Sequence, residues 1–257
     1  MIRCPLFLLP VLLTLPIATA DEAAEALVLA TYKLAGDGST ATGFVVEKKG
    51  AGDGIKRFLI TAHHVFNQMK GNSFKLVSRK RKDDGTFSRN EIEIALREDG
   101  KNLWKKHKRE DLAVLPLPDS AVVEALPFDC IATEGSLEAV HSGDDVRLAV
   151  YPEKSEANGA GFPLLRRGSI AGYPILPLKP HPMFVVDTTT WPGDSGGPVI
   201  HATLRSPSGG PLVIGIVRGM RSITDTEKES RYVERKTSYP LDIAEVLHAA
   251  LLRDLIR

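Results

Sequence analysis

Short apolar stretches recur along most of the chain, and clusters of turn-forming residues separate them. Several of them alternate apolar and polar side chains, as Ile92-Glu93-Ile94 does, which is typical of strands that bury one face. Gly, Asp and Ser clusters such as 83–85 and 206–210 favour turns between the stretches. The pattern predicts strands at residues 27–34, 43–47, 58–60, 74–77, 92–96, 112–117, 146–151, 168–171, 183–188, 198–202 and 212–217.

A helix is predicted at the end of the chain. After Pro240, apolar residues recur at steps of three and four, which is the spacing of one helix face, at Ile243, Val246, Leu247, Ala250, Leu251 and Leu255. Many short strands with so little predicted helix indicate an all-β chain of sandwich or barrel type rather than alternating βαβ units.

The first 20 residues have the organisation of a secretory signal peptide. Arg3 precedes an apolar run over 5–17, and residues 18–20 supply the small-x-small pattern that signal peptidase cuts. The run is shorter than the about 20 residues that a membrane-spanning helix needs, and two prolines interrupt it. We therefore expect an exported protein, periplasmic or secreted, that begins at Asp21 and is not stably inserted in a membrane. A buried N-terminal helix is the alternative.

Composition describes an ordinary packed protein with little net charge. Hydrophobic residues make up 43% of the 257 residues and charged residues 25%, which excludes a disordered or collagen-like chain. The formal net charge is +1, so bulk charge does not indicate binding to nucleic acid or to an anionic membrane. Removal of residues 1–20 would take away Cys4 and leave Cys130 alone, so the mature chain could form no internal disulfide.

Three motifs contain the residue types of nucleophilic catalysis. ITAHHV, DLAVL and WPGDSGGP place His63 and His64, Asp111, and Ser195 in that order, with 47 residues from His64 to Asp111 and 84 from there to the serine. A serine hydroxyl needs a base within hydrogen-bond reach, imidazole suits that role near neutral pH, and a carboxylate can fix its tautomer. Glycines beside the serine let backbone N–H groups converge on an oxyanion.

Each motif alone has a simpler explanation. A single His or Asp is usually a surface or capping residue, and a glycine-rich segment is usually a turn. Asp99 and Asp119 are alternative acids for the histidine. The ordered combination is what favours catalysis.

The three motifs in this order resemble those of the chymotrypsin-like, or trypsin-fold, serine peptidases, in particular the bacterial, disulfide-poor V8-like and HtrA-like branch. The resemblance spans about residues 27–245. It implies two six-stranded antiparallel β-barrels with the active site between them, and an endopeptidase that acts on polypeptides without a cofactor or metal. Carried over by position, it makes Ser195 the nucleophile, Asp111 the orienting acid, and the N–H groups of Gly193 and Ser195 the oxyanion hole. The base is the fourth residue of the TAxH segment, which selects His64 over His63.

The residue pattern and the resemblance together predict a domain organisation. Residues 1–20 are the signal peptide, 21–118 the N-terminal barrel, 119–130 a crossover linker, and 131–257 the C-terminal barrel with the terminal helix.

The chain departs from the family pattern before the serine. Members activated by trimming pair a new apolar N-terminus with the Asp that precedes the serine. Here the mature chain would begin with the acidic Asp21-Glu22, so Asp194 must find another partner.

The resemblance places the specificity pocket at Thr189, Thr190, Val217, Arg218 and Gly219. Members that cut after Lys or Arg carry Asp where this chain has Thr189, so we expect a preference for small, neutral or acidic side chains. Glutamate-preferring members add a His on the following strand, which residues 216–219 lack. Arg218 is expected to face solvent, with the alternative that it charges the pocket and attracts acidic substrates.

Two other functions fit parts of the sequence. The serine motif also satisfies the G-x-S-x-G of α/β-hydrolase esterases, but the strand-like 198–200 and the order His, Asp, Ser do not fit that fold. A catalytically silent binding module on the peptidase scaffold is the stronger alternative.

Two basic segments, 79–82 and 105–109, are interpreted as solvated loops. The alternative is a surface for an anionic ligand, such as an acidic protein or an envelope polysaccharide. The sequence contains no metal-ligand spacing, phosphate-binding loop or nucleic-acid motif, so we expect neither a metal nor a nucleic-acid partner.

Overall fold

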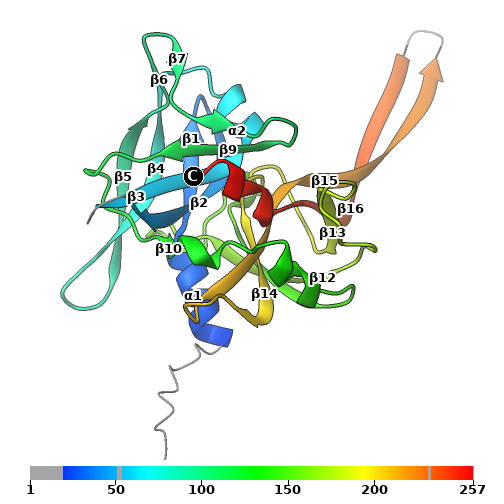
Figure 1. Cartoon of the computed structure of the whole chain (residues 1–257). Helices are drawn as coiled ribbons and strands as arrows, with labels where there is room; N and C mark the ends of the chain where they lie inside the picture. Colours follow the sequence, from blue (N-terminus) through cyan, green and yellow to red (C-terminus); the bar gives the residue numbers. More distant parts are fainter. Residues whose placement is uncertain (1–19, 51–53, 231–232, 257) are drawn as a thin grey trace, which may run out of the picture.

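The computed structural model describes residues 20–50, 54–230 and 233–256. Apart from Ala20, the predicted signal peptide lies outside these residues. Two β units lie side by side, with helix α1 (Ala20–Leu29) beneath them and a long hairpin projecting from one of them (Figure 1). Within the described residues, none of the helices is long and apolar enough to cross a membrane.

The first unit is a mixed sheet in the order β5-β4-β1-β2-β3-β9-β8, with β10 pairing in parallel with β2. A separate pair, β6 (Arg97–Glu98) and β7 (Lys101–Asn102), lies at its edge, and α2 (His63–Gln68) follows β3. The strands of the sheet are β1 (Thr31–Gly36), β2 (Ser39–Lys49), β3 (Ile55–Ala62), β4 (Ser73–Arg81), β5 (Phe87–Ala95), β8 (Lys105–Lys106), β9 (Leu112–Pro116) and β10 (Leu126–Pro127).

The second unit is a closed six-stranded barrel in the order β11-β12-β13-β16-β15-β14. Its strands are β11 (Asp145–Val150), β12 (Leu164–Ile170), β13 (Met183–Asp187), β14 (Pro198–Arg205), β15 (Pro211–Ser230) and β16 (Val233–His248). Short 3₁₀ helices occur at Phe128–Cys130, Gly135–Ala139, Pro152–Lys154 and Ala249–Asp254. The predicted all-β architecture is confirmed, with one closed barrel and a second sheet.

Strand β9 shows how the apolar pattern builds this arrangement. Its alternate residues Leu112 and Val114 lie in the core between the two units, whereas Ala113 and Leu115 lie in the core of the first sheet. Because both faces are buried, the strand is a continuous apolar run rather than an alternating one. Leu112, the first residue of the strand, is fully buried, and Asp111 directly precedes it.

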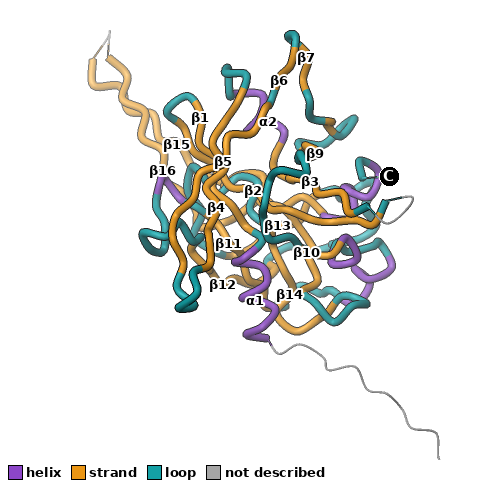
Figure 2. Tube along the Cα trace, turned by 90° about the vertical axis from the view of Figure 1, so that its left-hand side faces the viewer, coloured by secondary structure: helices purple, strands orange, loops and turns teal. Residues whose placement is uncertain are grey.

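The structure corrects the predicted strand at 27–34. Its first residues belong to α1, because Ala23 and Leu27 are spaced by four and both pack into the core between the units. Figures 1 and 2 both place this helix beside β14. The strand starts only at Thr31.

The predicted C-terminal helix is also wrong. Strand β16 continues to His248 and pairs with β13 on one side and β15 on the other, and a 3₁₀ helix follows it at Ala249–Asp254. Val246 faces the barrel core while Leu247 faces the core between the units, so both faces of the strand are apolar. Because both faces of β16 are buried, its apolar residues fall at a spacing that resembles a helix face. Pairing with β13 and β15 nevertheless makes the segment a strand.

The basic segment 79–82 is not a solvated loop, because β4 continues to Arg81. The Arg79 guanidinium lies 4.7 Å from the Tyr32 ring centre. It donates to the carbonyls of Leu29, the last residue of α1, and Thr31, the first residue of β1, and to the Tyr151 hydroxyl at 3.1 Å. Tyr151 follows β11 of the barrel, so Arg79 links the helix and both units. Lys105 and Lys106 of the second segment form β8.

Strands β15 and β16 extend far beyond the barrel as a paired hairpin (Figures 1 and 2). Its base carries the candidate pocket residues 217–219, so the hairpin rises from the edge of the candidate site.

Candidate active site

The histidine and acid motifs meet because β3 and β9 are antiparallel neighbours. Ala62, the last residue of β3, lies opposite Leu112, the first residue of β9. Helix α2 starts directly after β3, so His64 lies in its first turn, and Asp111 directly precedes β9. The strand register therefore places the two side chains at the same edge of the sheet.

Three hydrogen bonds join these two segments. His64 Nδ1 lies 2.7 Å from Asp111 Oδ2, and the His64 backbone N–H donates to Asp111 Oδ1 at 2.8 Å. The His63 N–H donates to the Asp111 backbone carbonyl at 3.1 Å. An ionised carboxylate only accepts, so Nδ1 carries the proton and Nε2 is left free to act as a base. Asp111 is therefore the acid that contacts His64, and Asp99 and Asp119 are not.

The ionised state of Asp111 is favoured by its partners. Burial raises its pKa, but the hydrogen bonds from the His64 side chain and backbone, together with the charge of Arg218, hold the pKa below its usual value. The carboxylate is therefore charged at neutral pH, as an acid that stabilises an imidazolium must be.

The serine loop is fastened to both units. Thr42 of β2 donates its N–H to the Ser195 carbonyl at 3.1 Å and its hydroxyl to the Gly193 carbonyl at 2.8 Å. From the barrel, the Val217 carbonyl accepts the N–H of Gly196 at 2.7 Å. Because the loop is anchored to both sheets, the serine lies at their junction.

Glycine is required twice in this loop. Gly193 has a φ of +101° and Gly196 a φ of +91°, in the left-handed region that favours glycine. A Cβ at Gly193 would collide with the Tyr151 carbonyl, and one at Gly196 with the carbonyl of Thr42. The backbone is thus packed too closely for any other residue.

The serine and the histidine border one cavity of about 280 Å³, which Gly193 also lines. The Ser195 hydroxyl donates to the Arg218 carbonyl at 3.1 Å, and among the described residues no hydrogen bond joins it to His64. The N–H groups of Gly193 and Ser195 have no acceptor in the described part of the chain. Both donors are therefore available to a bound group.

The partner of Asp194, which the sequence did not identify, is Arg166. The Asp194 carboxylate is 1% exposed, accepts the Trp191 N–H at 2.9 Å through Oδ2, and lies 3.4 Å from Arg166 Nη1 on β12. Burial raises its pKa to about 6, against the opposing effects of the Trp191 hydrogen bond and the Arg166 charge. The motifs gave no sign of Arg166, because nothing in the sequence separates it from Arg167 beside it.

The candidate pocket residues differ in their surroundings. Thr189 is exposed, while Thr190 and Val217 are buried and Gly219 is half-buried. The Arg218 side chain is 44% exposed, with Nη1 at 3.1 Å from Glu245 and Nε at 3.9 Å from Asp111. Two carboxylates therefore contact Arg218, and one of them, Glu245, also lies 3.5 Å from Arg221 Nε. No motif in the sequence indicates Glu245 as a site residue.

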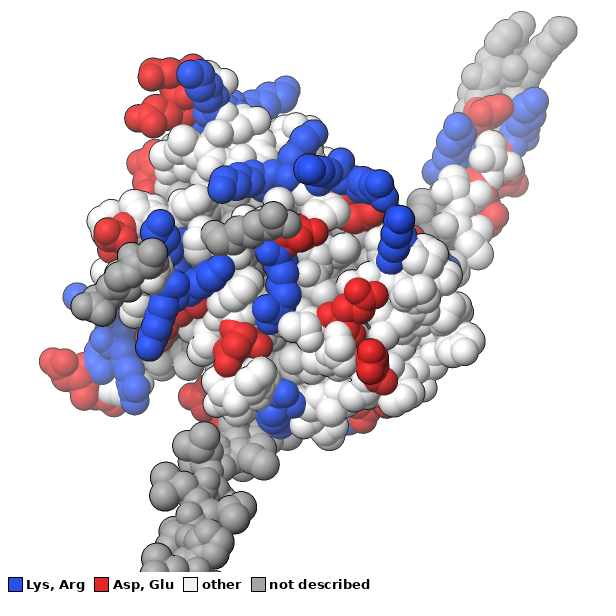
Figure 3. All heavy atoms as spheres, viewed as in Figure 1, with Lys and Arg blue, Asp and Glu red and all other residues white. Residues whose placement is uncertain are grey.

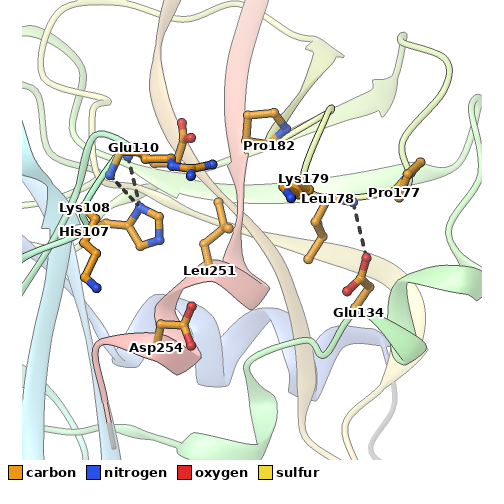
Figure 4. Close-up of a pocket in the computed structure, with 11 residues that line it drawn as sticks. His107, Lys108, Glu110, Glu134, Pro177, Leu178, Lys179, Pro182, Leu251 and Asp254 are labelled. Atoms are coloured by element: carbon orange, nitrogen blue, oxygen red, sulfur yellow. Dashed lines mark hydrogen bonds between the residues drawn. The ribbon is translucent and has the colours of Figure 1, made fainter.

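A second cavity, of about 410 Å³, contains no residue of the three motifs (Figure 4). It combines basic and acidic side chains, with Lys108 and Lys179 near Glu134 and Asp254. Figure 3 shows Lys and Arg gathered in a band across this face, with Asp and Glu among them. An anionic ligand at the basic residues stays a prediction. Within the described ranges, no group of three or more His, Cys, Asp or Glu side chains could hold a metal ion.

Comparison with known proteins places this geometry in a family. A model of the trypsin-like peptidase domain matches residues 41–206. A comparison with curated proteins finds none that matches.

Solved structures agree in fold. The inactive form of the Rv3671c protease is 18% identical and has a TM-score of 0.52, with 94% of this chain and 98% of that chain covered. A serine-to-alanine mutant of Rv3671c from M. tuberculosis H37Rv, also inactive, is 17% identical, with a TM-score of 0.52 and 95% of each chain covered. Human heparin binding protein is 12% identical, with a TM-score of 0.53, 90% of this chain and 91% of that chain. Because the family model matches more than half of the chain, this protein belongs to the trypsin-like peptidase family and is a serine-type peptidase.

Proposed function

We propose that the protein is an exported serine endopeptidase in which His64, Asp111 and Ser195 form the catalytic triad. The observation that supports this most is the 2.7 Å contact between His64 Nδ1 and Asp111 Oδ2, in an imidazole that borders the same cavity as Ser195. It leaves Nε2 as the proton acceptor.

The proposed reaction has two halves, formation and hydrolysis of an acyl-enzyme, and the triad and the oxyanion hole act in both. On substrate binding, the Ser195 hydroxyl exchanges its bond to the Arg218 carbonyl for one to His64 Nε2, since catalytic hydrogen bonds often form only in the complex. His64 takes the proton as Oγ attacks the scissile carbonyl, and the N–H groups of Gly193 and Ser195 stabilise the oxyanion. His64 then protonates the leaving amine, and water hydrolyses the acyl-enzyme by the same steps.

Export is part of the proposal and rests on the signal-like residues 1–20. A mature chain that begins at Asp21 would keep the part of α1 that packs into the core, since Ala23, Ala24 and Leu27 are all buried.

A silent binding module is the second candidate, and the bond from Ser195 to the Arg218 carbonyl favours it. A fluorophosphonate probe, which reacts only with an activated serine, distinguishes the two. We expect the mature protein to be labelled at pH 8, and Ser195→Ala to abolish the labelling.

Ser208→Ala is the matched control. Ser208 is an exposed loop serine ten residues beyond the serine motif. Its hydroxyl donates to Asp129 at 3.0 Å and does not border the cavity of His64, so its variant should label like the wild type. A folded wild-type protein that the probe does not label would support the binding module.

Substrate preference follows from the pocket. Thr189 offers no charge to a basic side chain, and Arg218 is already paired with Asp111 and with Glu245, which it shares with Arg221, so we propose a preference for small, neutral side chains before the cleaved bond. In peptides that differ only at this position, kcat/KM for Ala or Val should exceed that for Lys or Arg by at least about tenfold. Strong cleavage after Lys or Arg would overturn this assignment of the pocket.

A further inference from the structure

The buried carboxylate of Asp194 lies between the two residues whose N–H groups are free. Its Oδ2 accepts the Trp191 N–H at 2.9 Å and faces Arg166 Nη1 at 3.4 Å, while Oδ1 is buried without a hydrogen-bond partner. A buried carboxylate stays ionised only beside a compensating charge. In the described part of the chain, Arg166 is the cation that forms an ion pair with it.

Arg166 holds two parts of the site at once. The same Nη1 donates to the carbonyl of Thr189, two residues before Trp191. One guanidinium therefore fixes the start of the serine loop through a backbone carbonyl and its centre through Asp194. The Arg166 side chain is only 18% exposed, so solvent screens this pair weakly.

The neighbouring arginine points the other way. Successive residues of a strand face opposite sides, and the Arg167 side chain is 73% exposed with a 3.6 Å contact to Asp145. The register of β12 against β11, with Arg166 opposite Leu148, sets which of the two arginines points inward.

We propose that Arg166 is a positioning residue for the oxyanion hole, and that its charge keeps Asp194 ionised and buried so that the N–H groups of Gly193 and Ser195 stay aimed at the substrate. The proposal rests on the proposed peptidase function of this loop. Since the cation comes from β12, the serine loop is ordered without a newly cut N-terminus. Without that cation, Asp194 must take up a proton or leave its site, and either change weakens its bond to Trp191.

The test separates charge from hydrogen bonding. Arg166→Gln keeps an N–H donor for Thr189 but loses the charge, whereas Arg166→Lys keeps the charge. We expect Arg166→Gln to lower kcat by about 10²- to 10³-fold with a small change in KM, as loss of one oxyanion donor does. Arg166→Lys should recover most of that loss, and the control Arg167→Gln should match the wild type. Equal kcat in the Gln variants at 166 and 167 would overturn the proposal.

A second readout does not depend on catalysis. The protein has two tryptophans, and Trp191 is half-exposed within the serine loop. In a Trp104→Phe background, Arg166→Gln should change the Trp191 emission and its quenching by acrylamide, whereas Arg167→Gln should not. Unchanged Trp191 emission in Arg166→Gln would overturn the proposal even if the wild type proves inactive. An inactive wild type whose Trp191 emission does change in Arg166→Gln would instead count against the peptidase function.

Discussion

Replacing His64 by alanine should lower kcat by about 10⁶-fold, because the serine then has no base to take its proton. The mutation removes the Nε2 acceptor and also leaves Asp111 without the ring that Oδ2 contacts at 2.7 Å. The imidazole borders an open cavity, so its loss leaves the strand pairing of β3 with β9 intact. Steady-state hydrolysis of the best peptide substrate measures the effect, and thermal unfolding verifies the fold.

His63→Ala is the matched control for this variant. His63 precedes His64 in the same helical turn, and its backbone N–H, which the substitution keeps, donates to the Asp111 carbonyl. Burial, followed by the charge of Lys106, lowers the pKa of its imidazole, so this ring adds no charge near the site at neutral pH. The control should hydrolyse peptides within a few-fold of the wild type. A larger loss in His63→Ala than in His64→Ala would mean that His63, and not His64, is the base.

Much of the candidate site was within reach of the sequence, because its chemistry lies in short motifs at strand ends. The contact between His64 and Asp111 follows from two apolar stretches that pair as neighbours, and the serine turn follows from its glycines. The residues that support the site were not predictable in this way. Strand register and side-chain direction bring three residues to the site, namely Thr42, Arg166 and Glu245. The spacing of residues along the sequence does not reveal either property.

The errors in the fold have the same origin. The helical run before Thr31 and the strand through Leu247 both bury apolar residues on the surfaces where the two units meet. A strand buried on both faces loses its alternation, and the last four residues of α1 are all apolar, so they resemble the start of a strand. The sequence predicts a solvated charge at Arg79, because nothing local shows that aromatic rings and free carbonyls converge on it.

Asp111→Asn should lower kcat by about 10⁴-fold while the protein stays folded. The carboxylate accepts two hydrogen bonds from His64, one from the ring and one from the backbone, through different oxygens. An amide has a single acceptor oxygen, so its NH₂ group faces one of these donors or forces the imidazole into the tautomer with the proton on Nε2. In that tautomer Nε2 cannot accept the serine proton, and the amide gives no charge to stabilise the imidazolium.

Two further carboxylates serve as controls for this variant. Asp99 lies in the turn between β6 and β7 with a φ of +48°, where asparagine is equally well accommodated, and Asp119 follows β9. Asp99→Asn and Asp119→Asn should both keep wild-type kcat, since neither side chain hydrogen bonds to His64 in the described structure. If Asp99→Asn or Asp119→Asn caused the large loss while Asp111→Asn stayed active, the acid of the triad would be misassigned. If all three variants kept full activity, the contact between His64 and Asp111 would be structural rather than catalytic.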